Sequence, residues 1–250
     1  MRAARDRSYV HGMTNTASTE LHPRAATRRA QRRRTGDRRE VSPPSSAWLR
    51  VMARVYDPFV WLGELSGMSS RRSALAGNAR GRVVEIGAGT GLNIAHYPDG
   101  IAELVLTEPD AAMRRRLARR LQRHGRVAQI VDAPAEHLPL AEASVDTVVS
   151  TLVLCTVDDP ERTLREIARV LRPGGQLLFI EHVRASSRLL AACQDYLFRP
   201  WRGFAGGCCC NRRTVELMHA CGFAVEADGA VWRGMPAIVR PLVVGRATPG

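Results

Sequence analysis

Lysine is absent from this sequence of 250 residues, and all 37 basic residues are arginine. Nucleic-acid-binding proteins are not usually free of lysine, so the absence indicates a compositional bias and not selection for phosphate contacts. Long apolar runs are absent too. None reaches the roughly 18 residues of a membrane-spanning helix, and the first residues show no charged-then-apolar signal peptide. These absences predict a soluble, cytoplasmic protein.

Paired cysteines are also missing. The six cysteines include no C-x-x-C pair, and three of them, Cys208, Cys209 and Cys210, are adjacent. Adjacent side chains cannot all point at one metal ion without strain, so the spacing gives little support to a zinc site. The sequence therefore predicts reduced thiols and no metal.

The positive charge is concentrated at the start of the chain. The formal net charge is +13, and residues 1–40 hold 11 arginines against four acidic residues. Residues 1–47 contain few large apolar residues to offset the entropy of ordering, which predicts a disordered arginine-rich tail. Such a tail either contacts nucleic acid or an anionic membrane surface, or is simply solvated. No aromatic residues alternate with the arginines for base stacking, which favours the solvated tail.

Short apolar runs alternate with amphipathic stretches from residue 81 onward. This alternation predicts an α/β fold: a Rossmann-like parallel sheet with helices on both faces, whose ligands bind at the carboxyl ends of the strands. The predicted strands are residues 82–86, 103–107, 127–131, 145–150 and 176–180, and the predicted helices are residues 92–97, 110–123 and 159–171.

The pattern changes after residue 180. A further helix is predicted at residues 214–220, and two final strands, residues 223–227 and 237–244, are predicted to form an antiparallel pair joined near Asp228. The predicted division of the chain is a tail (1–47), N-terminal cap helices (48–80) and a sheet domain (81–246) with an insertion (185–210) on the acceptor side.

A glycine-rich loop follows the first predicted strand. Gly87, Gly89 and Gly91 are spaced by two residues, which lets the backbone turn tightly and approach a ligand closely. The predicted helix after this loop would direct its free N–H groups to the same place and favour a carboxylate or phosphate. A preceding strand and a following helix are the context that makes such a loop informative.

Two acidic residues narrow the choice of ligand. Glu108, at the end of the second predicted strand, is placed to accept hydrogen bonds from both hydroxyls of a ribose, which indicates a nucleoside cofactor. Dinucleotide-binding loops normally read G-x-G-x-x-G, whereas this loop reads G-x-G-x-G. Glu85, two residues before the first glycine, would repel a pyrophosphate but suits an amino group. S-adenosylmethionine has an amino group, a carboxylate and a ribose, and no phosphate.

With these motifs the chain resembles the class I S-adenosylmethionine-dependent methyltransferases, which include the ubiquinone/menaquinone C-methyltransferases. The resemblance covers about residues 50–245 and rests on residues 85–91, Glu108 and residues 135–140 and 171–175. Residues 150–157, 181–183 and 207–208 look like the methyltransferase-like branch whose animal members methylate alkyl thiols. Those members carry a hydrophobic N-terminal anchor, where this chain has an arginine-rich segment.

The resemblance implies a seven-stranded methyltransferase architecture and S-adenosylmethionine as the cofactor. It implies a small, fairly apolar acceptor, with a thiol ranked before a quinone-like ring and a lipid amine. The site residues that it implies are Glu85, Gly87, Ala88, Gly89 and Gly91 for the methionine end of the cofactor, Glu108 for the ribose, Ala135 and Glu136 for the adenine, and Thr151 near the point of methyl transfer.

Methyl transfer from a sulfonium requires alignment of the acceptor, and a base only where the acceptor must lose a proton. His182, at the end of the fifth predicted strand, is the candidate base. Asp195 and Cys208, in the insertion, are candidates for lining the acceptor pocket. Eight of the few aromatic residues lie in two groups, at residues 48–61 and 196–204, which we predict to meet as a cap over the strand ends.

Two alternative functions remain open from the sequence. One is a nicotinamide-dependent oxidoreductase, which the spacing of the glycine loop disfavours and for which no Tyr-x-x-x-Lys pair exists in a chain without lysine. The other is a non-catalytic cofactor-binding module whose basic arm docks on nucleic acid or on a membrane.

Overall fold

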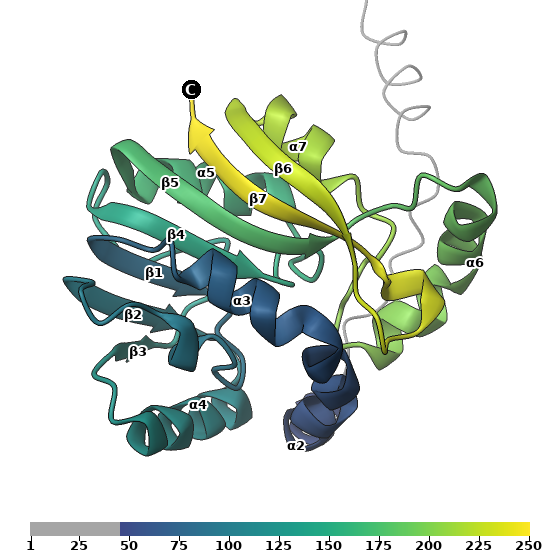
Figure 1. Cartoon of the computed structure of the whole chain (residues 1–250), viewed down its shortest axis with the longest axis horizontal. Coiled ribbons are helices and arrows are strands. Elements are labelled where there is room, and N and C mark those ends of the chain that lie inside the picture. Colours follow the sequence, from purple (N-terminus) through teal and green to yellow (C-terminus); the bar gives the residue numbers. More distant parts are fainter. Residues whose placement is uncertain (1–45) are drawn as a thin grey trace, which may run out of the picture. The chain divides into compact units, whose positions relative to one another are not determined.

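The computed structural model describes residues 46–250, without the side chains of Ser46 and Leu49, so the tail predicted at residues 1–47 lies almost entirely outside the described residues. The described strands form one sheet of seven (Figure 1). They are β1 (Arg82–Ile86), β2 (Glu103–Thr107), β3 (Gln129–Val131), β4 (Val145–Thr151), β5 (Leu171–His182), β6 (Phe223–Val231) and β7 (Pro241–Pro249).

The strand order across the sheet is β3-β2-β1-β4-β5-β7-β6. The strands from β3 to β5 are parallel, and β7 runs antiparallel to both β5 and β6. The predicted parallel sheet with an antiparallel C-terminal pair is confirmed. The order of connection reverses between β1 and β4, and ligands of α/β sheets bind beyond the carboxyl ends of the strands at such a point.

Helices cover both faces of the sheet, because successive side chains of a strand point to opposite sides. The α-helices are α2 (Ser46–Gly63), α3 (Ser69–Ala76), α4 (Ala111–His124), α5 (Pro160–Val170), α6 (Arg188–Phe204) and α7 (Thr214–Ala220). Val83 of β1 packs in one core with Leu75 of α3 and Leu117 of α4. Val84 packs in a second core with Leu164 of α5. Figure 1 shows α3 in front of the sheet and α5 and α7 behind it.

Local capping signals set the ends of two helices. Asp110 and Asp159 precede α4 and α5, and each carboxylate accepts backbone N–H bonds from the first turn of its helix. Gly125 ends α4 in the left-handed conformation, with φ of +60°. Both helices therefore begin and end within a residue or two of the positions that the sequence predicts.

The predicted helix at residues 92–97 is wrong. After the glycine loop only a 3₁₀ turn forms, at Ile94–His96. Pro98 lacks a backbone N–H and disfavours the helical conformation at the residue before it, and the Asn93 side chain is bonded to Glu85 of β1. The anion site expected at the N-terminus of this helix is therefore not formed.

The predicted C-terminal hairpin is correct in direction but wrong in position. The strand β6 continues through Asp228 to Val231, because Asp228 pairs with Val244 and is not a turn residue. The connection between the strands lies later, where Ala237–Val239 forms a 3₁₀ turn. A turn dipeptide is a weak signal where a neighbouring strand is available for pairing.

The segments predicted as cap and insertion are largely helical. Residues 48–80 contain most of α2 and all of α3, joined by a π-helical turn (Glu64–Met68) in which Gly67 has φ of +110°. Residues 185–210 contain α6. The division of the chain into domains stays a prediction.

Across residues 46–250, no helix combines the length and the apolar character that crossing a bilayer requires.

Candidate functional site

A cavity of about 450 Å³ lies at the carboxyl ends of β1, β2 and β4. Its volume is within the range of small-molecule and cofactor sites. Of the predicted site residues, it is lined by Gly87, Gly89, Glu108, Ala135, Glu136 and Thr151, and not by Glu85, Ala88, Gly91 or His182. Tyr56, from the predicted aromatic group at residues 48–61, also lines it. The lining residues that were not predicted are Met52, Pro109, Asp110, Met113, Pro134, Leu152, Val153, Thr156, Val157, Asp158, Arg202, Ala205, Gly206 and Gly207.

The glycine loop contributes bare backbone to the wall of this cavity. Gly87 and Gly89 have φ of +55° and +57°, in the left-handed region that favours glycine. A Cβ on Gly87 would lie 2.8 Å from Cγ2 of Val153, whereas a Cβ on Gly89 would meet nothing closer than 3.9 Å. The loop therefore leaves room for a ligand to approach its backbone.

Gly91 has a different role, in the core below the loop. Its φ is +86°, and an added Cβ would lie 2.5 Å from Cδ1 of Ile94 and 2.7 Å from Cδ1 of Leu117. We expect Gly91→Ala to lower the free energy of unfolding by about 2–5 kcal/mol, the sum of left-handed strain and overpacking.

Urea unfolding of this variant tests the prediction, with Gly125→Ala as the control. Gly125 has a similar φ of +60° and open space around it, so its substitution should cost only about 1–2 kcal/mol. Equal losses in the two variants would contradict the packing argument.

Glu108 connects the end of β2 to the glycine loop. Its Oε2 accepts the Gly89 N–H at 2.9 Å, and its Oε1 accepts the Asp110 N–H at 2.9 Å. Burial raises the pKa of this carboxyl above its ordinary value. Each carboxylate oxygen has two lone pairs, so Glu108 retains acceptor capacity on the cavity side for a pair of hydroxyls.

Glu85 lies behind the cavity wall and is 3% exposed. Its oxygens accept hydrogen bonds from Asn93 Nδ2 at 2.8 Å and from the Tyr97 hydroxyl at 2.7 Å. Burial raises the pKa of Glu85 to about 7, although these two bonds oppose the rise. These two donors could not be predicted from the sequence, because their approach to β1 depends on the 3₁₀ turn.

Thr151 and Glu136 are held by neighbours around the cavity. The Thr151 hydroxyl accepts from Asn93 Nδ2 at 3.0 Å, which links it to the bonds around Glu85. Glu136 Oε1 accepts the Asp158 N–H at 3.1 Å and so joins the loops after β3 and β4. Both residues therefore sit in a bonded network as well as on the cavity wall.

Glu181 is a buried residue of β5 for which the sequence suggested no role. It is fully buried, and its carboxylate accepts from the Ser150 hydroxyl at 2.7 Å and from the backbone N–H groups of Val153, Leu154 and Cys155 at 3.0–3.1 Å. The only indication in the sequence was that this acidic residue follows directly after the predicted strand at residues 176–180. Glu181 fixes the turn after β4 that forms one side of the cavity.

The two predicted aromatic groups meet beside the cavity. The ring centroid of Phe204, at the end of α6, lies 5.8 Å from each of the ring centroids of Trp48 and Phe59 of α2 and of Trp201. Met52 and Tyr56 of α2 and the residues after α6 line the cavity. Trp61 and Tyr196, which were predicted in the same groups, are 61% and 85% exposed and take no part in these ring contacts.

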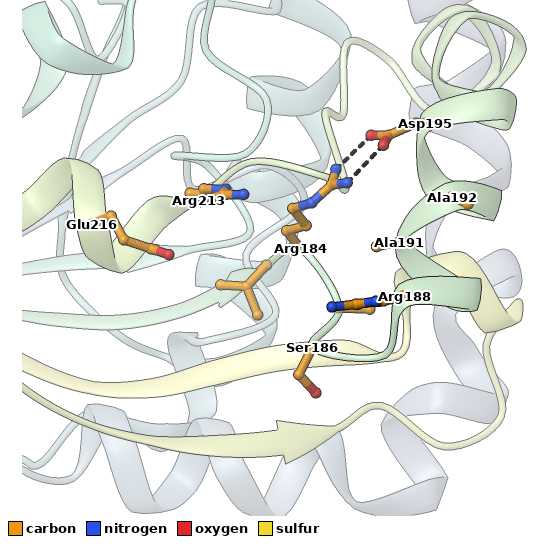
Figure 2. Close-up of a pocket in the computed structure, with 10 residues that line it drawn as sticks. Arg184, Ser186, Arg188, Ala191, Ala192, Asp195, Arg213 and Glu216 are labelled. Atoms are coloured by element: carbon orange, nitrogen blue, oxygen red, sulfur yellow. Dashed lines mark hydrogen bonds and ion pairs between the residues drawn. The ribbon is translucent and has the colours of Figure 1, made fainter.

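A second cavity, of about 520 Å³, lies between the end of β5, α6 and α7, and charged side chains are among those that line it (Figure 2). Arg184 pairs with Asp195 of α6 through both guanidinium Nη atoms, the longer of the two contacts being 2.7 Å. The Arg184 guanidinium lowers the pKa of Asp195 to about 2. Asp195 therefore lines this second cavity and not the first one.

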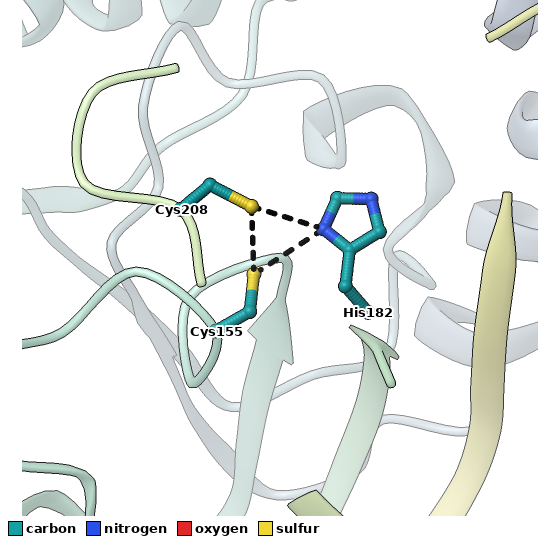
Figure 3. Close-up of side chains that lie close together, drawn as sticks. All are labelled: Cys155, His182 and Cys208. Carbon is teal, nitrogen blue, oxygen red and sulfur yellow. Dashed lines mark hydrogen bonds between the residues drawn. The ribbon is translucent and has the colours of Figure 1, made fainter. Parts of the chain in front are cut away.

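His182 is buried behind the turn after β4 and does not line the first cavity. Its Nδ1 lies 3.4 Å from the sulfur atoms of both Cys155 and Cys208 (Figure 3). Its Nε2 has no partner among the described residues. The predicted role of His182 as a base is untested, and its location gives that role no support.

Comparison with known proteins agrees with this arrangement. Residues 84–179 match the methyltransferase domain family. The human thiol S-methyltransferase TMT1B is 35% identical over 178 residues, covering 68% of this chain and 72% of its own. A phosphatidylethanolamine N-methyltransferase from Cereibacter sphaeroides is 34% identical over 142 residues, covering 55% of this chain and 68% of its own.

A solved structure has the same fold. DhpI in complex with S-adenosylhomocysteine (SAH) superimposes with a TM-score of 0.58 and 19% identity, covering 82% of this chain and 95% of its own. The family match and the human relative decide against an oxidoreductase and establish a methyltransferase, whose cofactor is S-adenosylmethionine. As the sequence resemblance predicted, the chain belongs to the class I S-adenosylmethionine-dependent methyltransferases.

Proposed function

We propose that this methyltransferase transfers a methyl group to the sulfur of a small, fairly apolar thiol. The observation that carries the proposal is the apolar wall of the first cavity, at the carboxyl ends of β1, β2 and β4, which includes Met52, Met113, Leu152 and Val153. An apolar acceptor gains affinity from such a wall in proportion to the area removed from water. The human relative that methylates thiols supports the choice of a thiol over a quinone-like ring or a lipid amine.

The proposal assigns residues that line the cavity to successive parts of the cofactor. Glu108 would accept the ribose hydroxyls, the loop at Gly87–Gly89 would lie against the methionine portion, and Ala135 and Glu136 would lie beside the adenine. Thr151 would mark the boundary between cofactor and acceptor. The bound cofactor supplies a methyl group activated on a sulfonium, so these residues need only hold it in line with the acceptor.

The wall contributed by α2 and α6 would exclude water and position the thiol. Burial raises the pKa of Tyr56 to about 12, so its hydroxyl stays protonated near neutral pH and can donate a hydrogen bond but not act as a base. Without an assigned base, the rate should follow the fraction of thiolate and rise with pH toward the pKa of the acceptor.

A comparison of matched acceptors tests the proposal. The full chain is incubated with S-adenosylmethionine labelled in its methyl group and, separately, with an alkyl thiol, the alcohol of the same carbon skeleton, a quinol, and vesicles containing phosphatidylethanolamine. We expect a labelled thioether from the thiol and no labelled product from the alcohol. Methylation of the quinol or of the lipid amine without methylation of the thiol would overturn the proposed acceptor.

The aromatic contacts between α2 and α6 lead to a prediction for Phe204→Ala. Loss of ring contacts worth about 1 kcal/mol should raise the KM for the thiol about threefold to tenfold, while the affinity for SAH changes less than twofold. Tyr196→Ala, on the same helix but 85% exposed, is the control and should leave both constants unchanged. An unchanged KM in Phe204→Ala would show that these contacts are only structural.

A further inference from the structure

Three side chains that can bind a metal ion, from distant parts of the chain, converge beside the first cavity (Figure 3). Cys155 follows β4, His182 ends β5, and Cys208 follows α6. Their residues are 0%, 5% and 6% exposed. Figure 3 shows both sulfur atoms and Nδ1 of the imidazole pointing toward one another.

The distances among the three ligand atoms are those of a metal site. The two sulfur atoms are 3.9 Å apart, and each lies 3.4 Å from Nδ1 of His182. A tetrahedral zinc ion, with Zn–S of about 2.3 Å and Zn–N of about 2.0–2.1 Å, separates two sulfurs by about 3.8 Å and sulfur from nitrogen by about 3.5–3.6 Å. The cluster matches this triangle without rearrangement.

Hydrogen bonding alone does not explain the symmetry of the cluster. A neutral imidazole offers at Nδ1 either one lone pair or one N–H, so it makes one good hydrogen bond there. Yet Cys155 and Cys208 approach Nδ1 to the same distance, 3.4 Å. An ion bound by all three atoms accounts for two equal distances.

We propose that Cys155, His182 and Cys208 form a Zn²⁺ site. The two thiols would bind as thiolates and release their protons to solvent, so the charges of the ion and its ligands cancel in the buried site. Three protein ligands leave the fourth position of a tetrahedral ion for a water or another small ligand.

The site would stabilise one wall of the first cavity. Thr156 and Gly207, next to Cys155 and Cys208, line that cavity, and the Cys209 N–H donates to the Cys155 carbonyl at 2.7 Å. The ion would therefore fix the turn after β4 and the loop after α6 to the end of β5. The prediction of no metal considered only spacing along the chain, where Cys155 and Cys208 are 53 residues apart.

Metal analysis of the full chain tests the proposal. The protein is produced without an affinity tag in zinc-containing medium, purified under reducing conditions, and analysed by mass spectrometry of its metals. We expect about one zinc per chain in the wild type and almost none in the double variant Cys155→Ser with Cys208→Ser. The control is Cys193→Ser with Cys209→Ser, which removes an exposed and a buried thiol outside the cluster and should retain the zinc.

Cobalt substitution keeps the test independent of how the variants fold. Co²⁺ added to the zinc-depleted wild type should produce thiolate-to-cobalt charge-transfer absorption and the visible bands of tetrahedral cobalt, which zinc should abolish. The proposal is overturned if the wild type carries no zinc and gives no such absorption. It is equally overturned if the double variant binds as much zinc as the wild type. A third contradicting result would be a freshly reduced wild type that takes up no ion and instead forms a Cys155–Cys208 disulfide in air.

Discussion

Replacing Glu108 with alanine should weaken SAH binding by about 1–3 kcal/mol, or about fivefold to 150-fold. The substitution removes the proposed acceptor of the ribose hydroxyls. It also leaves without partners the N–H groups of Gly89 and Asp110, which Glu108 accepts at 2.9 Å each. The lost ribose contact acts directly on binding, and the loss of the two backbone bonds removes the tie between β2 and the glycine loop against which the ligand would lie. Isothermal titration calorimetry with SAH measures the change.

Two variants separate the proposed contact from a general effect of charge. Glu108→Gln retains one acceptor oxygen, so its loss of affinity should lie between those of the wild type and Glu108→Ala. Glu103→Ala removes an exposed acid from the other end of β2 and should bind SAH like the wild type. If Glu108→Ala bound SAH as tightly as the wild type, Glu108 would not be the residue that binds the ribose.

Replacing Glu85 with glutamine should stabilise the protein without ligand at pH 8. Burial raises the pKa of Glu85 to about 7 in the folded state from an ordinary value of 4.5. Between these values the folded state holds a proton that the unfolded state has lost, so the wild type loses stability as pH rises from 4.5 to 7 and does not regain it above. Over this range the free energy of unfolding falls by about 3 kcal/mol. Glutamine stays neutral and can still bond to Asn93 and Tyr97.

Urea unfolding across this pH range measures that effect. The difference in free energy of unfolding between Glu85→Gln and the wild type should grow in favour of the variant from pH 4.5 to pH 7.5. Glu226→Gln, at an exposed ion pair with Arg246, is the control and should show no such trend. A difference that did not change with pH would mean that Glu85 is not buried in its protonated form.

The same substitution should weaken ligand binding, because an ionised Glu85 favours the ammonium group of the methionine portion. SAH affinity of the wild type should rise from pH 6 to pH 7.5 as Glu85 ionises, whereas that of Glu85→Gln should stay flat and lower. The variant would then be more stable and less able to bind, the trade-off expected of a buried charge retained for function. Unchanged affinity in the variant would assign Glu85 a structural role alone.

Signals confined to neighbouring residues were sufficient for much of the fold. Strand β1 is an apolar run that could only be buried, Asp110 and Asp159 carry the capping oxygens of their own helices, and the glycines of the loop adopt left-handed conformations. Each of these depends on a few consecutive residues. The succession of strands and helices along the chain could therefore be predicted from the sequence. The family could be predicted from the motifs at the ends of those strands.

Contacts between distant residues decided the rest. The helix expected after the glycine loop gave way to a 3₁₀ turn, which leaves Asn93 and Tyr97 to bond with Glu85. His182, predicted at the ligand edge, instead faces two sulfurs that the sheet and α6 bring to it from 26 and 27 residues away. The sequence determined which residues stand at the ends of the strands. Only the packing of the loops against the sheet decided which of them face the cavity and which are buried behind it, because that choice depends on space and partners supplied by the whole chain.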